Sequence, residues 1–237
     1  MNMNNMNNMN LADYNDPKSL GSRFRAKRMA PLIDLINQVH EQNGSVKLLD
    51  VGGRKTYWNA LPPGFLQERK VTITILNIPS DLQGEDDAIF KHVEGDACDM
   101  PQYRDNGFDV VHSNSVIEHV GGWEKIRAFS REVRRVAPNV FIQTPSFWFP
   151  VEPHFMKLFH HWMPRSLRIS MFMRFRMGQR GRAASLEEAI RKVEDEPYLL
   201  DYRMFRLLFP DGVIIKERVL FFTKSMVAYR NIFQSKA

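Results

Sequence analysis

Residues 46–53 read VKLLDVGG, a short apolar run that ends in two glycines. The run from Val46 to Val51 has the length of one buried strand, and Gly52 and Gly53 follow it without a spacer. Glycine lets a ligand approach the backbone closely, and open α/β sheets bind nucleotides at such turns. Many strand-to-helix turns contain two glycines for packing alone, so the pair by itself leaves both interpretations open.

Similar short runs recur along the chain and alternate with longer segments. Residues 71–78 are rich in β-branched side chains and stop at Pro79, and residues 139–144 stop at Pro145. This alternation favours the α/β class, with a doubly wound and mostly parallel sheet. The predicted strands are 46–51, 71–78, 91–94, 108–113, 139–144, 212–219 and 225–229, and the predicted helices are 30–43, 123–136 and 185–196.

The length of 237 residues fits one α/β domain with a buried core. Residues 1–10 contain only Asn and Met, so we expect a disordered tail over residues 1–20. A single domain is expected over residues 21–237, with a helical cap inserted around residues 147–200. The cap begins with FWFPVEPHFMKLFHHWMP at 147–164, where aromatic residues, prolines and histidines replace the strand pattern.

The net charge of +6 is concentrated in one segment. Six arginines and no acidic residue lie between Arg165 and Arg182. This segment is either a helix with its arginines in water or a surface that contacts anionic lipid or a phosphate-bearing acceptor. A basic charge confined to one place disfavours nucleic acid as a partner.

Two further features of the composition concern the compartment. No apolar run reaches the roughly 18 residues that span a bilayer, and the polar start lacks the pattern of a signal peptide. The single cysteine, Cys98, excludes an intramolecular disulfide, and its acidic neighbours Asp96 and Asp99 predict a small buried residue rather than a nucleophile. We therefore expect a cytoplasmic protein, with peripheral membrane contact as the open alternative.

Polar residues follow several of the predicted strands directly. Asn77 follows the second strand, Asp96 follows the third, and Ser113 with Asn114 ends the fourth. Because the carboxyl ends of parallel strands meet at one edge of a sheet, these side chains should face the same ligand. The dinucleotide pattern G-x-G-x-x-G and the phosphate-binding loop are both absent, which counts against NAD, FAD and nucleotide triphosphates.

The segments LLDVGGR, LNIPS, EGDACDMP, FDVVHSNSVIEHV and FIQTPS occur in this order. Together they resemble the motif set of class I S-adenosylmethionine-dependent methyltransferases, in the small-molecule group, over residues 47–145. The resemblance implies a Rossmann-like seven-stranded sheet, mostly parallel with an antiparallel last strand. It also implies methyl transfer from S-adenosylmethionine to a small-molecule or lipid-like acceptor. A hydroxyl oxygen is the preferred acceptor atom, and N-methylation is the alternative.

The resemblance implies a cofactor-binding role for residues at the ends of four strands. Two positions depart from the family pattern: Arg54 stands where a second glycine is common, and Asn77 replaces an acidic residue that anchors the ribose. A non-catalytic relative that only binds therefore stays an alternative. The implied contacts are Asp50, Gly52 and Gly53 around the methionine part, Asn77 at the ribose, Asp96 and Ala97 at the adenine, and Ser113 and Asn114 on the methionine side.

Methyl transfer to a hydroxyl needs alignment, exclusion of water and removal of one proton, a task that histidine often performs. His119 follows the fourth strand, and His154 follows Glu152 and the prolines Pro150 and Pro153 after the fifth. Both are candidate bases, and a structural role at a helix start is the alternative for His119. The adjacent His160 and His161 have poor ligand geometry on a helix, so no metal site is predicted.

Overall fold

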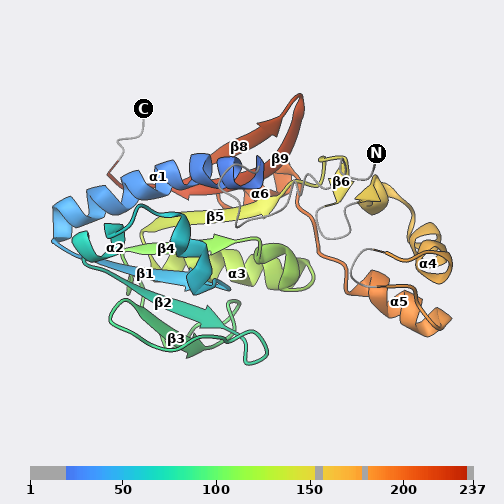
Figure 1. Ribbon diagram of the computed structural model, residues 1–237, viewed down its shortest axis with the longest axis horizontal. Coiled ribbons are helices and arrows are strands. Elements are labelled where there is room, and N and C mark those ends of the chain that lie inside the picture. Colours follow the sequence, from blue (N-terminus) through green and yellow to red (C-terminus); the bar gives the residue numbers. More distant parts are fainter. Residues whose placement is uncertain (1–19, 153–156, 178–180, 234–237) are drawn as a thin grey trace, which may run out of the picture.

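The computed structural model describes residues 20–152, 157–177 and 181–233. One seven-stranded sheet forms the centre of the molecule (Figure 1). Its order is β3-β2-β1-β4-β5-β9-β8. Among these strands, β9 runs in the direction opposite to the other six. The strands are β1 (Val46–Val51), β2 (Val71–Asn77), β3 (Phe90–Glu94), β4 (Val110–Asn114), β5 (Asn139–Pro145), β8 (Val213–Val219) and β9 (Phe222–Arg230). The predicted Rossmann-like sheet with an antiparallel last strand is thereby confirmed.

Helices cover both faces of the sheet and bury one apolar layer each. Alternation along β1 sends Leu48 to one layer and Leu49 to the other, as expected for a strand buried on both sides. The first layer packs under α1 (Leu20–Asn43), the 3-10 turn η1 (Lys55–Ala60) and α2 (Phe65–Glu68). The second packs under α3 (Trp123–Val136) and α6 (Tyr202–Leu208).

Two links between strands differ from the expected alternation with helices. Residues 78–89 and 95–109 are long enough for a helix, yet both are irregular in the structure. The first contains Pro79 and Gly84, and Gly84 adopts a φ of +120° that no helix contains. The carboxyl edge beside β2 and β3 is therefore bordered by loops.

A small unit connects β5 to α6 and projects from the sheet (Figure 1). Its helices α4 and α5 pack on each other around Phe172 and Val193. Ser185 caps α5 by accepting a hydrogen bond from the Glu188 backbone amide, as its sequence predicts. The elements are β6 (Val151–Glu152), β7 (Lys157–Leu158), η3 (His160–Trp162), α4 (Arg165–Arg174) and α5 (Leu186–Glu194).

The arginine-rich segment is helical over its first half and is partly neutralised. Arg165 pairs with Glu194 at 2.6 Å, Arg168 pairs with Glu196, and Arg182 donates to the Met173 carbonyl oxygen. These contacts hold the cap helices together. No helix in the described part of the chain is long and apolar enough to cross a bilayer.

Candidate functional site

The turn after β1 has room only for glycine at two consecutive positions. Gly52 has a φ of +69°, and a Cβ atom there would lie 2.5 Å from Val116 Cγ2. A Cβ atom on Gly53 would lie 1.9 Å from the Asp50 carboxylate oxygen Oδ2. Packing alone therefore requires the glycine pair, which also leaves the backbone of the turn half exposed at the sheet edge.

The Asp50 carboxylate supports this turn from inside the core. The residue is fully buried, its Oδ2 accepts from Trp58 Nε1 at 2.8 Å, and its Oδ1 accepts from His112 Nδ1 at 2.7 Å. Hydrogen bonds to a buried carboxylate offset the loss of its hydration. Asp50 thus fixes the position of the turn through Trp58 and His112, which sequence reasoning did not single out.

Asn77 and Ser113 join the neighbouring strand ends to the same turn. Asn77 Nδ2 donates to the Gly53 carbonyl oxygen at 2.8 Å, and Ser113 Oγ donates to the Val51 carbonyl oxygen at 2.8 Å. A carboxylate at position 77 could not make the first bond, because it has no hydrogen to donate when ionised. This contact gives a physical reason for the amide at a position where the resemblance leads one to expect an acid.

Asp96 offers a carboxylate at the end of β3. It accepts from the Cys98 backbone amide at 2.8 Å and from Lys125 Nζ at 3.1 Å, and about half of its side chain is exposed. The Cys98 amide and Lys125 hold the pKa of the Asp96 carboxyl below its ordinary value, although partial burial opposes them. Asp96 is therefore an ionised acceptor open to a ligand, and the half-buried Ala97 adjoins it.

Cys98 itself is a packing residue. It is buried, and its Sγ–H donates to the Lys125 carbonyl oxygen. Burial raises the pKa of the Cys98 thiol to about 11, and the nearby Asp96 carboxylate adds to the effect. The thiol stays protonated at neutral pH, which agrees with the expectation from its acidic neighbours.

The Asn114 side chain accepts a hydrogen bond from Arg28, which also forms an ion pair with Glu217 that the sequence did not reveal. Arg28 on α1 donates from Nη1 to Asn114 Oδ1 at 2.6 Å and makes two hydrogen bonds of 2.8 Å to Glu217 on β8. Ser225 also donates to Glu217. This network joins the first helix, the end of β4 and the last hairpin at one place on the sheet edge.

Of the two candidate bases, the structure describes only His119. His119 is exposed in η2 (Ile117–His119), directly after β4, whereas His154 lies outside the described residues. Glu118, which directly precedes His119, is almost fully buried, and its Oε2 accepts a hydrogen bond from Thr144 Oγ1 at 3.1 Å. The Glu118 carbonyl oxygen also accepts from the Tyr198 amide, so η2 contacts the segment that leaves the cap.

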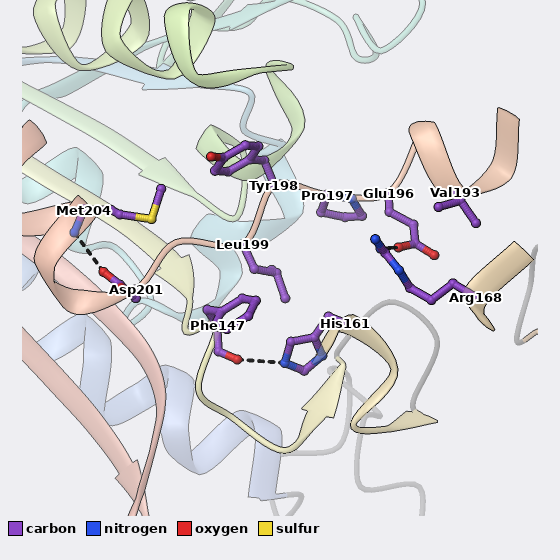
Figure 2. Close-up of a pocket in the computed structure, with 10 residues that line it drawn as sticks. All are labelled: Phe147, His161, Arg168, Val193, Glu196, Pro197, Tyr198, Leu199, Asp201 and Met204. Atoms are coloured by element: carbon purple, nitrogen blue, oxygen red, sulfur yellow. Dashed lines mark hydrogen bonds and ion pairs between the residues drawn. The ribbon is translucent and has the colours of Figure 1, made fainter. Parts of the chain in front are cut away.

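That segment borders a cleft of about 430 Å³ between the end of β5 and the cap (Figure 2). His161 Nε2 donates to the Phe147 carbonyl oxygen at 2.7 Å on one wall, and on the other wall Arg168 pairs with Glu196. Both walls lie within the cap that was predicted around residues 147–200, but the contact between Arg168 and Glu196 was not foreseen. The lining residues are Phe147, His161, Arg168, Val193, Glu196, Pro197, Tyr198, Leu199, Asp201 and Met204.

The other cap histidine is also engaged in the protein. His160 is fully buried, and its Nε2 lies 2.7 Å from Glu196 Oε1. Glu196 therefore bridges His160 and Arg168 behind the cleft wall. In the part of the chain that the structure covers, no group of three or more His, Cys, Asp or Glu side chains is arranged to hold a metal ion.

Comparisons with known proteins agree with this geometry. A family model described as a methyltransferase domain matches residues 73–139, from β2 to the start of β5. No curated protein sequence matches the chain.

Three similar solved structures are methyltransferases by their descriptions. The CurJ carbon methyltransferase superposes with a TM-score of 0.52 at 12% identity, over 89% of this chain and 55% of that one. An O-methyltransferase family protein from Burkholderia thailandensis gives 0.47 at 16% identity, over 89% and 62%. Phosphoethanolamine N-methyltransferase 2 from Haemonchus contortus, in complex with S-adenosyl-L-methionine, gives 0.44 at 14% identity, over 83% and 43%.

The chain spans less than two thirds of the length of each of these three structures. The likeness to the CurJ structure therefore supports the fold alone. The family model identifies residues 73–139 as similar to a methyltransferase domain. The ordered motifs and the sheet with its antiparallel last strand resemble those of class I S-adenosylmethionine-dependent methyltransferases, and residues 73–139 match the model of a methyltransferase domain.

Proposed function

We propose that the chain transfers the methyl group of S-adenosylmethionine to a hydroxyl oxygen of a small-molecule or lipid-like acceptor. The observation that carries this proposal is the cleft of about 430 Å³ at the end of β5, whose lining residue Tyr198 is hydrogen-bonded to Glu118 in the motif after β4. Its size suits a small ligand, since such pockets commonly measure about 300–1,000 Å³.

The residues at the sheet edge fit the proposed cofactor. The turn at Gly52 and Gly53 has no Cβ atom to exclude a ligand, and Asp96 is an ionised, half-exposed acceptor for an adenine amino group. Ala97 would pack beside the adenine, and Asn77 retains its Oδ1 oxygen as a ribose acceptor. Asp50, Ser113 and Asn114 would act by holding the strand ends in place, through the hydrogen bonds described above.

The sulfonium of the cofactor supplies an electrophilic methyl group, so the protein must align the acceptor and exclude water. Phe147, Tyr198 and Leu199 give the cleft an apolar side for that purpose. Removal of the hydroxyl proton is proposed for His119 or His154. His119 is exposed beside the end of β4, where the methyl group would lie.

A second candidate function is cofactor or ligand binding without turnover. It is favoured by Asn77, whose amide is bonded to the Gly53 carbonyl oxygen, and by Arg54 at a position where glycine is common. Both features could weaken the ribose and turn contacts that a methyltransferase uses. If the chain is an enzyme, N-methylation is the alternative to O-methylation.

Two measurements separate these functions. Isothermal titration calorimetry with S-adenosylhomocysteine tests cofactor binding, and tritiated methyl transfer into fractionated cell extract tests turnover. Binding with label in a small-molecule or lipid fraction supports the proposal. Binding without transfer to any fraction supports the second candidate, and absence of binding refutes both.

The proposed location is the cytoplasm, consistent with a single cysteine held as a thiol. For the segment between Arg165 and Arg182, contact with an anionic surface was left open beside a helix with its arginines in water. Arg165 and Arg168 are paired with acidic residues of the cap, so less of that charge is available than the sequence suggests.

A further inference from the structure

The hairpin formed by β8 and β9 ends in an unusual turn. Val219 pairs with Phe222, so Leu220 and Phe221 form a two-residue loop. Two-residue hairpin loops need a positive φ at the first central position or at both, and glycine at the first position is the residue that adopts it with least strain. Here Leu220 has a φ of +54°, a conformation that is strained for a side chain of this size.

The same two residues are almost completely exposed. Leu220 is 85% exposed, Phe221 is 96% exposed, and the neighbouring Phe222 is also exposed. Exposed leucine and phenylalanine at a strained turn lower both solubility and stability. Such a combination is expected where the turn has a function that a polar turn could not serve.

The charge around this tip is basic. Lys216 and Arg218 are exposed on β8, and the one acidic residue of that strand, Glu217, is nearly buried in its ion pair with Arg28. The exposed charged groups of the hairpin near its tip are therefore cations. An apolar tip with flanking cations is complementary to a bilayer that contains anionic lipid.

A further exposed apolar residue, Trp148, lies in the segment that is hydrogen-bonded to the start of β9. The Ser146 amide donates to the Lys224 carbonyl oxygen, which joins the start of the cap to the start of β9. Trp148 follows two residues later and is 58% exposed. Figure 1 shows the hairpin of β8 and β9 projecting beyond the rest of the sheet. Tryptophan is enriched where proteins meet the headgroup region of a membrane.

We propose that the tip at Leu220, Phe221 and Phe222 inserts into the surface of a membrane that contains anionic phospholipid, with Lys216 and Arg218 at the headgroups. A second copy of the chain fits this tip poorly. Stable interfaces bury about 800 Å² per partner, far more than a two-residue turn offers. A symmetric dimer through the tip would also bring the same cations together.

The inference does not depend on methyl transfer, but it bears on the acceptor. β9 pairs with β5, and Phe147, two residues after β5, lines the cleft. Docking through the hairpin would hold the cleft at the membrane surface, where a lipid-like acceptor could enter it.

The test uses flotation of the full chain with vesicles of phosphatidylcholine alone and of phosphatidylcholine with 30 mol% phosphatidylserine. The double variant Leu220→Gly/Phe221→Asn places glycine at the position with positive φ and a polar residue beside it. It should keep or raise the melting temperature and lower the partition coefficient onto the anionic vesicles by tenfold or more. The matched control is Val213→Asn, an exposed apolar position at the far end of β8 that should bind as the parent does.

The salt dependence of binding, sedimentation and calorimetry give independent readouts. Binding of the parent should weaken between 50 and 300 mM salt, because exposed cations lose their attraction to anionic lipid. Equal binding by the parent and the double variant, or no binding of the parent to anionic vesicles, would overturn the inference. A dimer of the parent that the double variant abolishes in vesicle-free sedimentation would also overturn it, in favour of a second copy. Calorimetry with S-adenosylhomocysteine should give the same affinity for the parent and the double variant. A loss of membrane binding in the variant is thereby separated from a loss of the proposed function.

Discussion

Gly53→Ala should destabilise the protein, because of the carboxylate beneath the turn. The new Cβ atom would lie 1.9 Å from Asp50 Oδ2, whereas unbonded heavy atoms settle at about 3.5 Å. Either the turn or the carboxylate must therefore move by about 1.5 Å. Oδ2 is the atom that accepts from Trp58 Nε1 at 2.8 Å, so that hydrogen bond is the first contact to break.

The magnitude follows from the loss of this bond. A buried hydrogen bond to a charged group contributes about 1.5–3 kcal/mol. For a chain of this size, 1 kcal/mol changes the melting temperature by about 2–4 °C. Gly53→Ala should thus lower the melting temperature by about 3–12 °C in differential scanning calorimetry. Gly122→Ala is the control, since no atom lies within 4 Å of its new Cβ, and it should shift the melting temperature by much less.

A double-mutant cycle tests the assigned cause. In an Asp50→Ala background the obstructing carboxylate is gone, so the added effect of Gly53→Ala should be markedly smaller. A Gly53→Ala protein that melts with the parent, or an equal effect in both backgrounds, would refute the steric explanation.

Three further predictions concern the cofactor, the thiol and the base. Asp96→Ala should weaken binding of S-adenosylhomocysteine by about 1.5–3 kcal/mol in calorimetry, and unchanged affinity would remove Asp96 from the adenine site. Cys98 should react with iodoacetamide at pH 8 about 100-fold more slowly than an unfolded-chain thiol, because its pKa is raised from 9.0 to about 11. Unfolding in guanidinium should abolish that difference, and equal rates in the native protein would contradict the burial. His119→Gln or His154→Gln should lower turnover by about 10²–10⁴-fold without changing cofactor affinity. If both variants turn over like the parent, neither histidine is the base.

The sequence predicted the sheet well because its strands are marked by local signals. Residues 46–51 and 123–136 were predicted with the bounds that the structure has, the first from its apolar run before Gly52 and the second from helical periodicity. Segments 78–89 and 95–109 were assigned no helix, although the alternating pattern left room for one in each, and both are irregular in the structure. Their length allowed a helix, but length carries no information on backbone geometry.

The contacts of the candidate site depended on partners far away in the chain. Arg28 and Glu217 are 189 positions apart, and neither lies in a motif, so no spacing rule could join them. His112 lies in an apolar strand that gives no hint of its bond to Asp50. The strand ends could be placed at one edge from topology, whereas the hydrogen bonds made there could not.

The place of β9 in the sheet has a consequence for how the protein is made. β9 follows β8 in the chain, yet it lies between β5 and β8 in the sheet. Until it arrives, β5 has a free edge whose seven residues, all buried in the finished sheet, remain uncovered. The nascent chain therefore presents an aggregation-prone edge from the time β5 is made until β9 pairs with it. Its yield in cells should depend on chaperones and on translation speed between β5 and β9, more than the stability of the finished fold would suggest.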